Sequence, residues 1–478
     1  VIPNHCSLFA MALDADPVSI RSLPTTDPTK MRMVMKPTAI SPRPISRRDF
    51  LWMTSLSAAG FVLGCATNPV SGRRQVMLVS EDQEINIDRQ YSPHQFSTDY
   101  GRLQDKSLNR YVAGIGKKMA AHTHRPEMPY SITGVNAVYV NAYAFPGGSI
   151  GVTRGIMLEL DSEAEMAALV GHELGHVNAR HTASLMSKKM LATAIAGGVA
   201  AYVGVKNESV GAGILAAQLG LLTSGVLLAK YSRDNERQAD ALGMEYMVES
   251  GYSPDGMVDL MEMLESMSKH KQSATQLLFS THPMSAERRK TAISAAESEY
   301  GYAKDKSIYR ERYKDYTAGL RRIEGAIKEM QTGEALMAQN KYTEAENHYR
   351  KALKQAPEDY AALVMMSKCM LAQKKTDAAG RYADKAKEIF PEEAQAHYLG
   401  GYSNIVRKKY AAAYTDFSAY EKQLPGNPHT HFFKGLSLEG MQRKEDADQE
   451  YHRFLQQVNQ GDEARYAYQR LKEWGYVR

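Results

Sequence analysis

The chain has 478 residues and a formal net charge of +5, with 43% apolar and 24% charged residues, a composition typical of globular proteins. Residues 1–64 carry seven cations and four anions, so the rest of the chain carries about +2. A body so nearly neutral shows no sign of the clustered basic face that nucleic-acid-binding proteins use, and we therefore predict no nucleic-acid partner.

Residues 1–64 are predicted to be an export leader. Arg47 and Arg48 precede an apolar run at residues 51–63, an order typical of a twin-arginine signal. As a helix this run would rise only about 20 Å, less than the ~30 Å of a bilayer core, which argues against an uncut membrane anchor. Residues 1–30 lie upstream of any normal signal, so initiation at a methionine among residues 31–35 is an alternative start.

The leader ends at residues 62–65 in a sequence that resembles a lipobox, in which the cysteine is lipidated and becomes the new N-terminus. Leu63 is larger than the residue usual at its position. We predict a lipid at Cys65, a polar tether at residues 65–80 and a location in the periplasm, on the inner face of the outer membrane. Beyond the leader and Cys65 only Cys369 remains, so an internal disulfide is not expected.

A region of mixed character follows at residues 81–325. Residues 137–153 alternate in polarity and are broken by Phe145-Pro146-Gly147-Gly148, which predicts two strands joined by a turn. Such a hairpin either offers an edge strand to an extended peptide or is purely structural. Residues 161–165 supply cap-type side chains and negative charge before an apolar run, which predicts the start of a helix.

This helix carries the sequence His172-Glu173-Leu174-Gly175-His176. Two histidines four residues apart lie on one helical face and can share a metal ion. Glu173 lies about 100° around the helix from His172, where it can reach a metal-bound water as general base. The alternative is a helix with two surface histidines, but the apolar residues on both sides make a buried polar cluster costly without a metal. His181 is predicted to point away from His172 on the same helix, in a supporting or surface role.

A tetrahedral catalytic zinc needs a third protein ligand. Ala179 and Thr182 occupy the positions where the extended metzincin motif requires glycine and histidine. Glu236 is the best candidate, because Asp240 one turn later can accept a hydrogen bond from a ligating histidine. A solvated acidic helix face is the alternative. Gly243 and a nearby alanine would let this helix approach the first one closely.

Residues 190–229 are apolar and rich in alanine and glycine. Residues 209–229 just reach the length of a membrane span, whereas residues 190–205 would rise only about 24 Å. We favour a buried or site-covering helical hairpin over a transmembrane one.

From residue 326 onward the chain repeats itself. The prolines and alanines that mark the repeat are spaced 34 residues apart: Pro357, Pro391 and Pro425, and Ala345, Ala379, Ala413 and Ala447. Aromatic residues keep a second phase at 349, 417 and 451, where Ala383 is the exception, and glycines keep a third at 333, 401 and 435. This period predicts tetratricopeptide repeats at residues 326–478, as four helical hairpins with a capping helix.

The repeats predict a groove that binds a protein partner. Helix positions that usually face the concave side hold apolar or aromatic residues, some of which could instead belong to the core: Val364, Tyr398, Tyr402, Ile405, Phe432 and Leu436.

Four collinear blocks give the chain a family resemblance. The turn at residues 145–148, the motif at residues 172–176, Arg233 with residues 236–240, and residues 281–283 with Arg288 are similar to peptidase family M48. The resemblance implies a mainly α fold, with an α+β zincin-type (gluzincin) metalloprotease domain and a small sheet, followed here by the α-solenoid. It implies one Zn²⁺ held by His172, His176 and Glu236.

The same resemblance implies that Glu173 is the base and that His282 and Arg288 lie near the active site, where they help to hold substrate or the oxyanion or, alternatively, only pack a helix start. The leader and repeats together resemble periplasmic members of the family that act on outer-membrane protein assembly.

We therefore predict an envelope endopeptidase that cleaves misfolded or stalled proteins delivered by its repeats. Two alternatives stay open. One is an assembly factor or chaperone with a latent peptidase, and the other is an integral-membrane protease if residues 190–229 span the bilayer.

Overall fold

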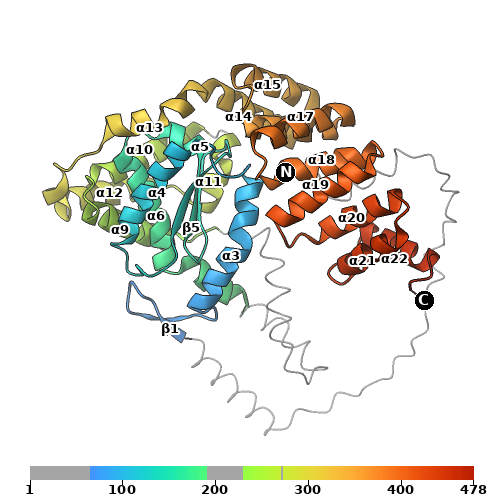
Figure 1. Cartoon of the computed structure of the whole chain (residues 1–478). Helices are drawn as coiled ribbons and strands as arrows, with labels where there is room; N and C mark the ends of the chain where they lie inside the picture. The colour runs from blue at the N-terminus through green and yellow to red at the C-terminus, as the bar shows by residue number, and fades with distance from the viewer. Residues whose placement is uncertain (1–64, 191–229, 271–272, 478) are drawn as a thin grey trace, which may run out of the picture.

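The computed structural model describes residues 65–190, 230–270 and 273–477. Figure 1 shows a lobe of helices around a small sheet, from which a curved stack of paired helices continues to the C-terminus. The predicted fold class, a mainly helical first domain with a small sheet followed by a helical repeat region, is confirmed.

The strands of the first lobe form two sheets. The two-stranded sheet pairs β1 (Cys65–Thr67) with β2 (Arg74–Val76), and the three-stranded sheet has the order β3 (Ser131–Val135), β5 (Ser149–Thr153), β4 (Ala142–Ala144). β5 runs parallel to β3 and antiparallel to β4. β4 and β5 are the two predicted strands, and the turn at residues 145–148 joins them.

Helices surround this sheet and build most of the lobe. They are α3 (Glu81–Thr98), α4 (Lys106–Ala120), α5 (Arg154–Glu159), α6 (Glu163–Asn178), α9 (Arg233–Glu249), α10 (Asp255–His270), η1 (Ser273–Thr275), α11 (Gln276–Thr281), α12 (Ala286–Ser298), η2 (Gly301–Ala303) and α13 (Arg310–Arg322). α6 begins where the sequence predicts, because the Ser162 side chain accepts a hydrogen bond from the Glu165 amide.

The close approach of α6 and α9 depends on small residues. A Cβ at Gly171 would lie 2.7 Å from the Gly243 carbonyl oxygen, and a Cβ at Gly175 would lie 2.8 Å from the Ala239 carbonyl oxygen. No side chain larger than hydrogen fits at such distances, so these glycines allow the two backbones to touch. The predicted close packing at Ala239 and Gly243 is confirmed.

The repeat stack consists of paired helices. They are α14 (Glu324–Ala338), α15 (Tyr342–Gln355), α16 (Tyr360–Ala372), α17 (Thr376–Ile389), α18 (Ala394–Val406), α19 (Tyr410–Gln423), α20 (Pro428–Gly440), α21 (Lys444–Leu455) and α22 (Asp462–Glu473). The alanines of the 34-residue period are fully buried, and they allow the helices of each pair to pack closely.

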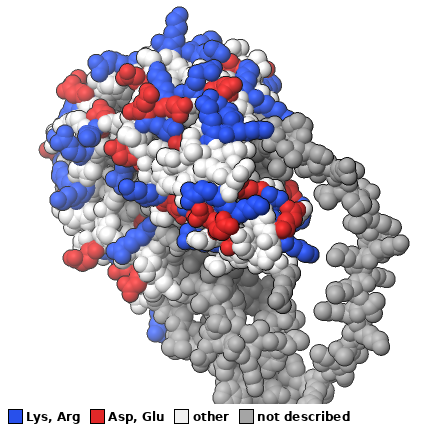
Figure 2. Space-filling model, turned by 45° about the vertical axis from the view of Figure 1, so that its right-hand side comes forward, with Lys and Arg blue, Asp and Glu red and all other residues white. Residues whose placement is uncertain are grey.

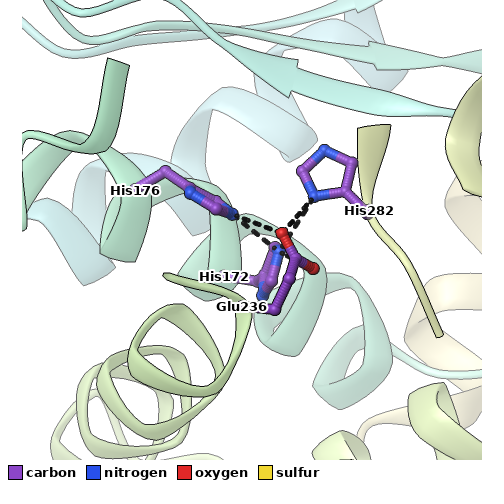
Figure 3. A group of neighbouring side chains, drawn as sticks. All are labelled: His172, His176, Glu236 and His282. Carbon is purple, nitrogen blue, oxygen red and sulfur yellow. Dashed lines mark hydrogen bonds and ion pairs between the residues drawn. The ribbon is translucent and has the colours of Figure 1, made fainter. Parts of the chain in front are cut away.

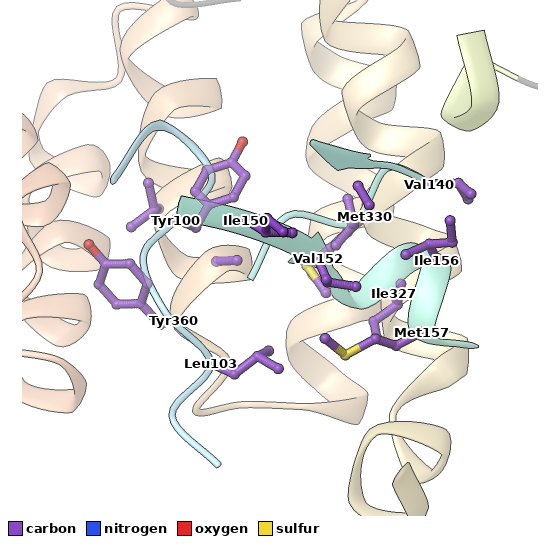
Figure 4. Packing of buried hydrophobic residues seen from close by; sticks show 14 of the residues in the cluster. Tyr100, Leu103, Val140, Ile150, Val152, Ile156, Met157, Ile327, Met330 and Tyr360 are labelled. Carbon is purple, nitrogen blue, oxygen red and sulfur yellow. The ribbon is translucent and has the colours of Figure 1, made fainter. Parts of the chain in front are cut away.

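One hydrophobic core runs from the first lobe into the stack. Figure 4 shows Ile150, Val152 and Ile156 of β5 and α5 close to Ile327 and Met330 of α14, all of them buried. The first repeat helix therefore completes the core behind the sheet. On the face drawn in Figure 2, positive and negative side chains are interspersed, so no single-sign field dominates that face of the described residues.

The segment predicted to be a tether, residues 65–80, is folded against the first lobe. β1 and β2 form a ribbon in which the Asn68 side chain donates to the Ala179 carbonyl oxygen, at 3.1 Å, and Met77 and Val79 are buried. The segment was predicted to be a polar tether, but the apolar side chains of Met77 and Val79 pack against the lobe and fold it there. Residues 1–64 and 191–229, including the predicted leader and the apolar hairpin or span, lie outside the described residues; among those described, no helix is long and apolar enough to cross a membrane.

Candidate metal centre

α6 presents the two histidines of the motif from one buried face. His172 and His176 are 5% and 1% exposed, and their Nε2 atoms lie 3.0 Å apart. The carboxylate of Asp240, on α9, lies 2.8 Å from Nδ1 of His172. Nδ1 therefore donates to Asp240, which leaves Nε2 of His172 without a proton and free to bind an ion.

Glu236, one turn before Asp240 on α9, faces both histidines. Its carboxylate oxygens lie 3.5 Å from Nε2 of His176 and 3.7 Å from Nε2 of His172, and the side chain is fully buried. The structure thus brings together the three residues predicted to be metal ligands.

His282 completes the group from the turn between α11 and α12. Its Nδ1 lies 3.3 Å from Nε2 of His172 and 3.2 Å from Oε1 of Glu236. Figure 3 shows His172, His176, Glu236 and His282 pointing toward one another. One ligand atom from each of these four residues lies within 4.8 Å of the other three, so His282 stands where a fourth ligand or a water would bind.

The distances fit a metal ion at the centre of this group. Two atoms bound to one tetrahedral zinc at about 2.0–2.1 Å lie roughly 3.3 Å from each other. The distances of 3.0–3.7 Å among the nitrogens of His172 and His176 and the oxygens of Glu236 bracket that value. The donor set, two imidazoles and a carboxylate, also suits a zinc ion that keeps one position for water.

Arg288 holds the carboxylates of the site. Its Nε and one terminal nitrogen each lie 2.7 Å from an oxygen of Asp240, and its other terminal nitrogen lies 2.7 Å from Glu236 and 3.2 Å from the Pro283 carbonyl oxygen. Burial opposes ionisation of Asp240, but Arg288 and His172 hold the pKa of its carboxyl below the usual range. In this arrangement the Arg288 side chain positions the ligand set; a contact with substrate stays a prediction.

Glu173 lies on the other side of His282, with Oε1 3.9 Å from Nε2 of that ring. Burial raises the pKa of its carboxyl, because a charge there has lost its water. Burial alone would lower the pKa of His282, but the carboxylates of Glu236 and Glu173 raise it overall. A carboxyl with a raised pKa beside an ion-binding group has the properties of a general base.

The predicted place of His181 was wrong. α6 ends at Asn178, and Arg180 adopts a left-handed backbone with φ 57°, so His181 lies beyond the helix and turns back. Its Nδ1 lies 2.9 Å from Nδ1 of His176, and its Nε2 lies 3.1 Å from Oε1 of Gln238. Helical spacing misplaced this residue because no glycine or proline marks the end of the helix.

Sequence reasoning also missed Tyr231. Its ring stacks on His176 with centroids 3.9 Å apart and an angle of 26° between the planes. Its backbone amide donates to the Thr281 carbonyl oxygen, which ties the start of α9 to the turn that carries His282. The only signal in the sequence is its position directly before Ser232, the N-cap of α9.

The groove residues predicted for the repeats belong mostly to the core. Five of the six are at most 9% exposed, and only Leu436 is half-buried: Val364, Tyr398, Tyr402, Ile405 and Phe432 are the buried ones. Tyr398 and Tyr402 both pack edge-on against Phe433, and Phe432 packs on Tyr451. These aromatic rings fill the space between helices, so an apolar groove at these positions was a wrong prediction and their alternative role in the core is the observed one.

A protein-family model described as Peptidase family M48 matches residues 106–296, and one described as Tetratricopeptide repeat matches residues 336–400. The metalloprotease YcaL of Escherichia coli (strain K12) is 34% identical over 185 residues, a match that covers 39% of this chain and 68% of YcaL. The chain belongs to peptidase family M48. All four residues that converge at the centre lie within the M48 match.

Two further relatives match most of the chain. The beta-barrel assembly-enhancing protease of Yersinia pestis is 26% identical over 324 residues, and that of Escherichia coli (strain K12) is 23% identical over 352 residues. The matches cover 63% and 70% of this chain and 66% and 72% of the two relatives, so the chain spans about two thirds of the length of the first.

Proposed function

We propose that this chain is a zinc-dependent endopeptidase of the cell envelope. The observation that carries the proposal is the convergence of the His172 and His176 Nε2 atoms on the Glu236 carboxylate, with Glu173 beside them. Membership of a family whose members are named metalloproteases supports the peptidase activity. Zinc is the metal that this set of two imidazoles and one carboxylate suits best.

His172, His176 and Glu236 would hold the zinc, which when bound would polarise a water and lower the pKa of that water toward about 7. As the general base, the Glu173 carboxylate would hold a proton at Oε1 and deliver it to the leaving amine. Asp240 keeps the proton of His172 on Nδ1. Arg288 keeps Asp240 ionised and holds both Asp240 and Glu236 in place. The small glycines between α6 and α9 hold the two helices, and therefore the three ligands, at a fixed separation.

Misfolded or stalled envelope proteins are the proposed substrates, and the repeats are proposed to bind them or a partner protein. The names of two relatives, which join a protease to the assembly of β-barrels, support this class. β4 pairs only with β5 among the described strands, so an extended substrate is proposed to lie along its free side.

The proposed location is the periplasmic side of the outer membrane, with a lipid at Cys65. The twin arginines and the sequence at residues 62–65 support it. We expect the Cys65→Ala protein to be extracted from envelope fractions by salt alone, while the parent needs detergent. Retention of both proteins in detergent-requiring membranes would instead support the spanning hairpin.

An assembly factor with a latent peptidase is a second candidate function. It is favoured by His282, whose ring stands at the fourth position of the centre and would keep water from it. An active endopeptidase hydrolyses unfolded protein once His282 moves away from the centre. An assembly factor with a latent peptidase does not.

The decisive test is Glu173→Gln in the purified full-length chain. We expect about one zinc per chain in both proteins and a loss of casein hydrolysis of about 10²–10⁴-fold in the variant, because the base is gone while the ligands remain. Glu344→Gln, an exposed carboxylate in the repeats, is the matched control and should leave activity unchanged. Equal activity of Glu173→Gln and the parent would refute the proposed mechanism.

A further inference from the structure

The two histidines of the site differ in the group that contacts their Nδ1 atom. His172 donates to the carboxylate of Asp240, whereas His176 faces the neutral ring of His181, which in turn faces Gln238. We infer that His181 is a positioning residue that fixes the tautomer of His176 and aims its Nε2 at the metal. The inference rests on the proposed zinc site.

Proton accounting supports this assignment. A neutral imidazole has one N–H donor and one nitrogen acceptor. If Nε2 of His176 binds an ion, its proton must be on Nδ1, which then donates to Nδ1 of His181 at 2.9 Å. The proton of His181 is therefore on Nε2, which donates to Oε1 of Gln238 at 3.1 Å. With both rings neutral, this arrangement satisfies both contacts and leaves His176 ready to bind metal.

The backbone is shaped to bring His181 back to the site. The chain reverses at Arg180, whose φ of 57° is in the left-handed region that normally favours glycine. Arg180 is held there by the fully buried carboxylate of Glu84, 3.1 Å from Nε, and by a hydrogen bond to the Val79 carbonyl oxygen at 2.8 Å. These buried partners hold Arg180 in the left-handed conformation that ends α6 and turns the chain back toward the site.

Thr182, the residue after His181, supports the ring of His176 from another side, through Tyr231. Thr182 Oγ1 lies 2.9 Å from the hydroxyl of Tyr231, and the Tyr231 ring stacks on His176. His176 is thus fixed at its Nδ1 edge by His181 and on its face by Tyr231, and both contacts depend on the turn at Arg180. This turn therefore orients one metal ligand without touching the metal position.

The test compares two substitutions of His181 in the full-length chain. His181→Phe keeps a ring but removes the acceptor, and His181→Asn places an amide oxygen near the former Nδ1. We expect His181→Phe to weaken zinc binding by about 10–100-fold, measured by competition with a chromophoric chelator, because partners of metal-bound histidines have effects of this size. His181→Asn should recover most of that loss. The cobalt(II) absorption spectrum should change in the phenylalanine variant and resemble that of the parent in the asparagine variant.

Controls separate this role from a merely structural one. His124, which is exposed and whose Nδ1 lies 2.7 Å from the Tyr246 hydroxyl at the far end of α9, provides a control variant, His124→Phe, that should bind zinc like the parent. Gln238→Leu should weaken zinc binding and Gln238→Glu should not, a comparison that stands if His181→Phe fails to fold. Zinc binding by His181→Phe within twofold of the parent, or His181→Asn as weak as His181→Phe, would overturn the inference. A parent chain that binds no zinc would refute the proposed function instead.

Discussion

The metal centre and the repeat stack both bury charged groups, but they do so in opposite ways. In the stack, the buried ammonium of Lys434 lies 2.8 Å from Glu421 and 2.9 Å from Glu450, so opposite charges neutralise one another. At the metal centre, two imidazole nitrogens 3.0 Å apart face a carboxylate, and all point at one place. Buried charge that is neutralised within the protein serves folding, whereas buried donors that converge on one point serve the binding of an ion.

Small residues also differ in purpose between the two regions. Between α6 and α9 the glycines face backbone atoms and let two helices touch. In the repeats they face aromatic rings: a Cβ at Gly333, Gly401 or Gly435 would lie 2.4–2.9 Å from Tyr349, Phe417 or Tyr451, respectively. Where the period has Ala383 in place of the aromatic residue, it has Ser367 in place of the glycine, so the two exceptions compensate in volume.

The largest effect is expected where charge joins the two regions. Asp359 caps α16 and lies within hydrogen-bond distance of Arg154 on α5 through both carboxylate oxygens, and both side chains are almost fully buried. Asp359→Ala should lower the free energy of unfolding by about 3–5 kcal/mol, because it leaves Arg154 buried without a partner. Urea denaturation measures the loss.

The same pair gives a pH dependence with a defined sign. Burial opposes ionisation of Asp359, but Arg154 holds the pKa of its carboxyl below the usual range. A lowered pKa in the folded state adds stability above the unfolded value of about 3.9 and loses it as pH falls through the folded value. The difference between parent and Asp359→Ala should thus be constant from about pH 5 to 8 and shrink below about pH 4.

The matched control for this prediction is Glu173→Gln in the metal-free chain. Burial raises the pKa of Glu173, so its charge costs stability, and the amide should be neutral or stabilising. If Glu173→Gln destabilised the chain as much as Asp359→Ala, the distinction between charge that serves folding and charge that serves binding would be lost.

A smaller effect is expected from filling the space opposite an aromatic ring. Gly401→Ala places a methyl group 2.9 Å from the Phe417 ring, which is fully buried, so the two helices must separate. We expect a loss of about 1–3 kcal/mol in the free energy of unfolding, typical of overpacking. Gly114→Ala is the control: it is exposed in α4 with no atom within 4 Å of the new methyl group, and should stabilise by roughly 0.5–1 kcal/mol. Equal stabilisation by both substitutions would show that the repeat glycines are not required by packing.

The sequence predicts those features of the chain that rest on local periodicity. Histidines four residues apart place His172 and His176 on one face, and the 34-residue period predicts the helical pairs of the stack. Both signals depend on helical geometry, which a chain imposes wherever it is helical.

Local periodicity does not predict where a helix ends or which distant residues pack against it. His181 leaves the helix because Arg180 adopts a left-handed backbone that buried partners distant in sequence stabilise. Tyr398 is buried because Phe433, from a neighbouring repeat, packs against it. In each case the deciding contact is tertiary, and the residue's own sequence neighbourhood holds no signal for it.

The smallest predicted effect tests whether the metal centre is closed at rest. His282 Nδ1 lies 3.3 Å from His172 and 3.2 Å from Glu236, so its ring occupies the place of a reacting water. We take about a tenth to a half of the chains to have the His282 ring moved out of the centre. His282→Ala should then raise peptide hydrolysis about two- to tenfold, because water reaches the centre in every chain without displacing the ring. Cleavage of a fluorogenic unfolded protein by the full-length chain measures this change. His124→Ala, remote from the centre, controls for the loss of an imidazole. A decrease instead of an increase would mean that His282 contributes to catalysis after the water has bound, and that the centre is open in the resting chain.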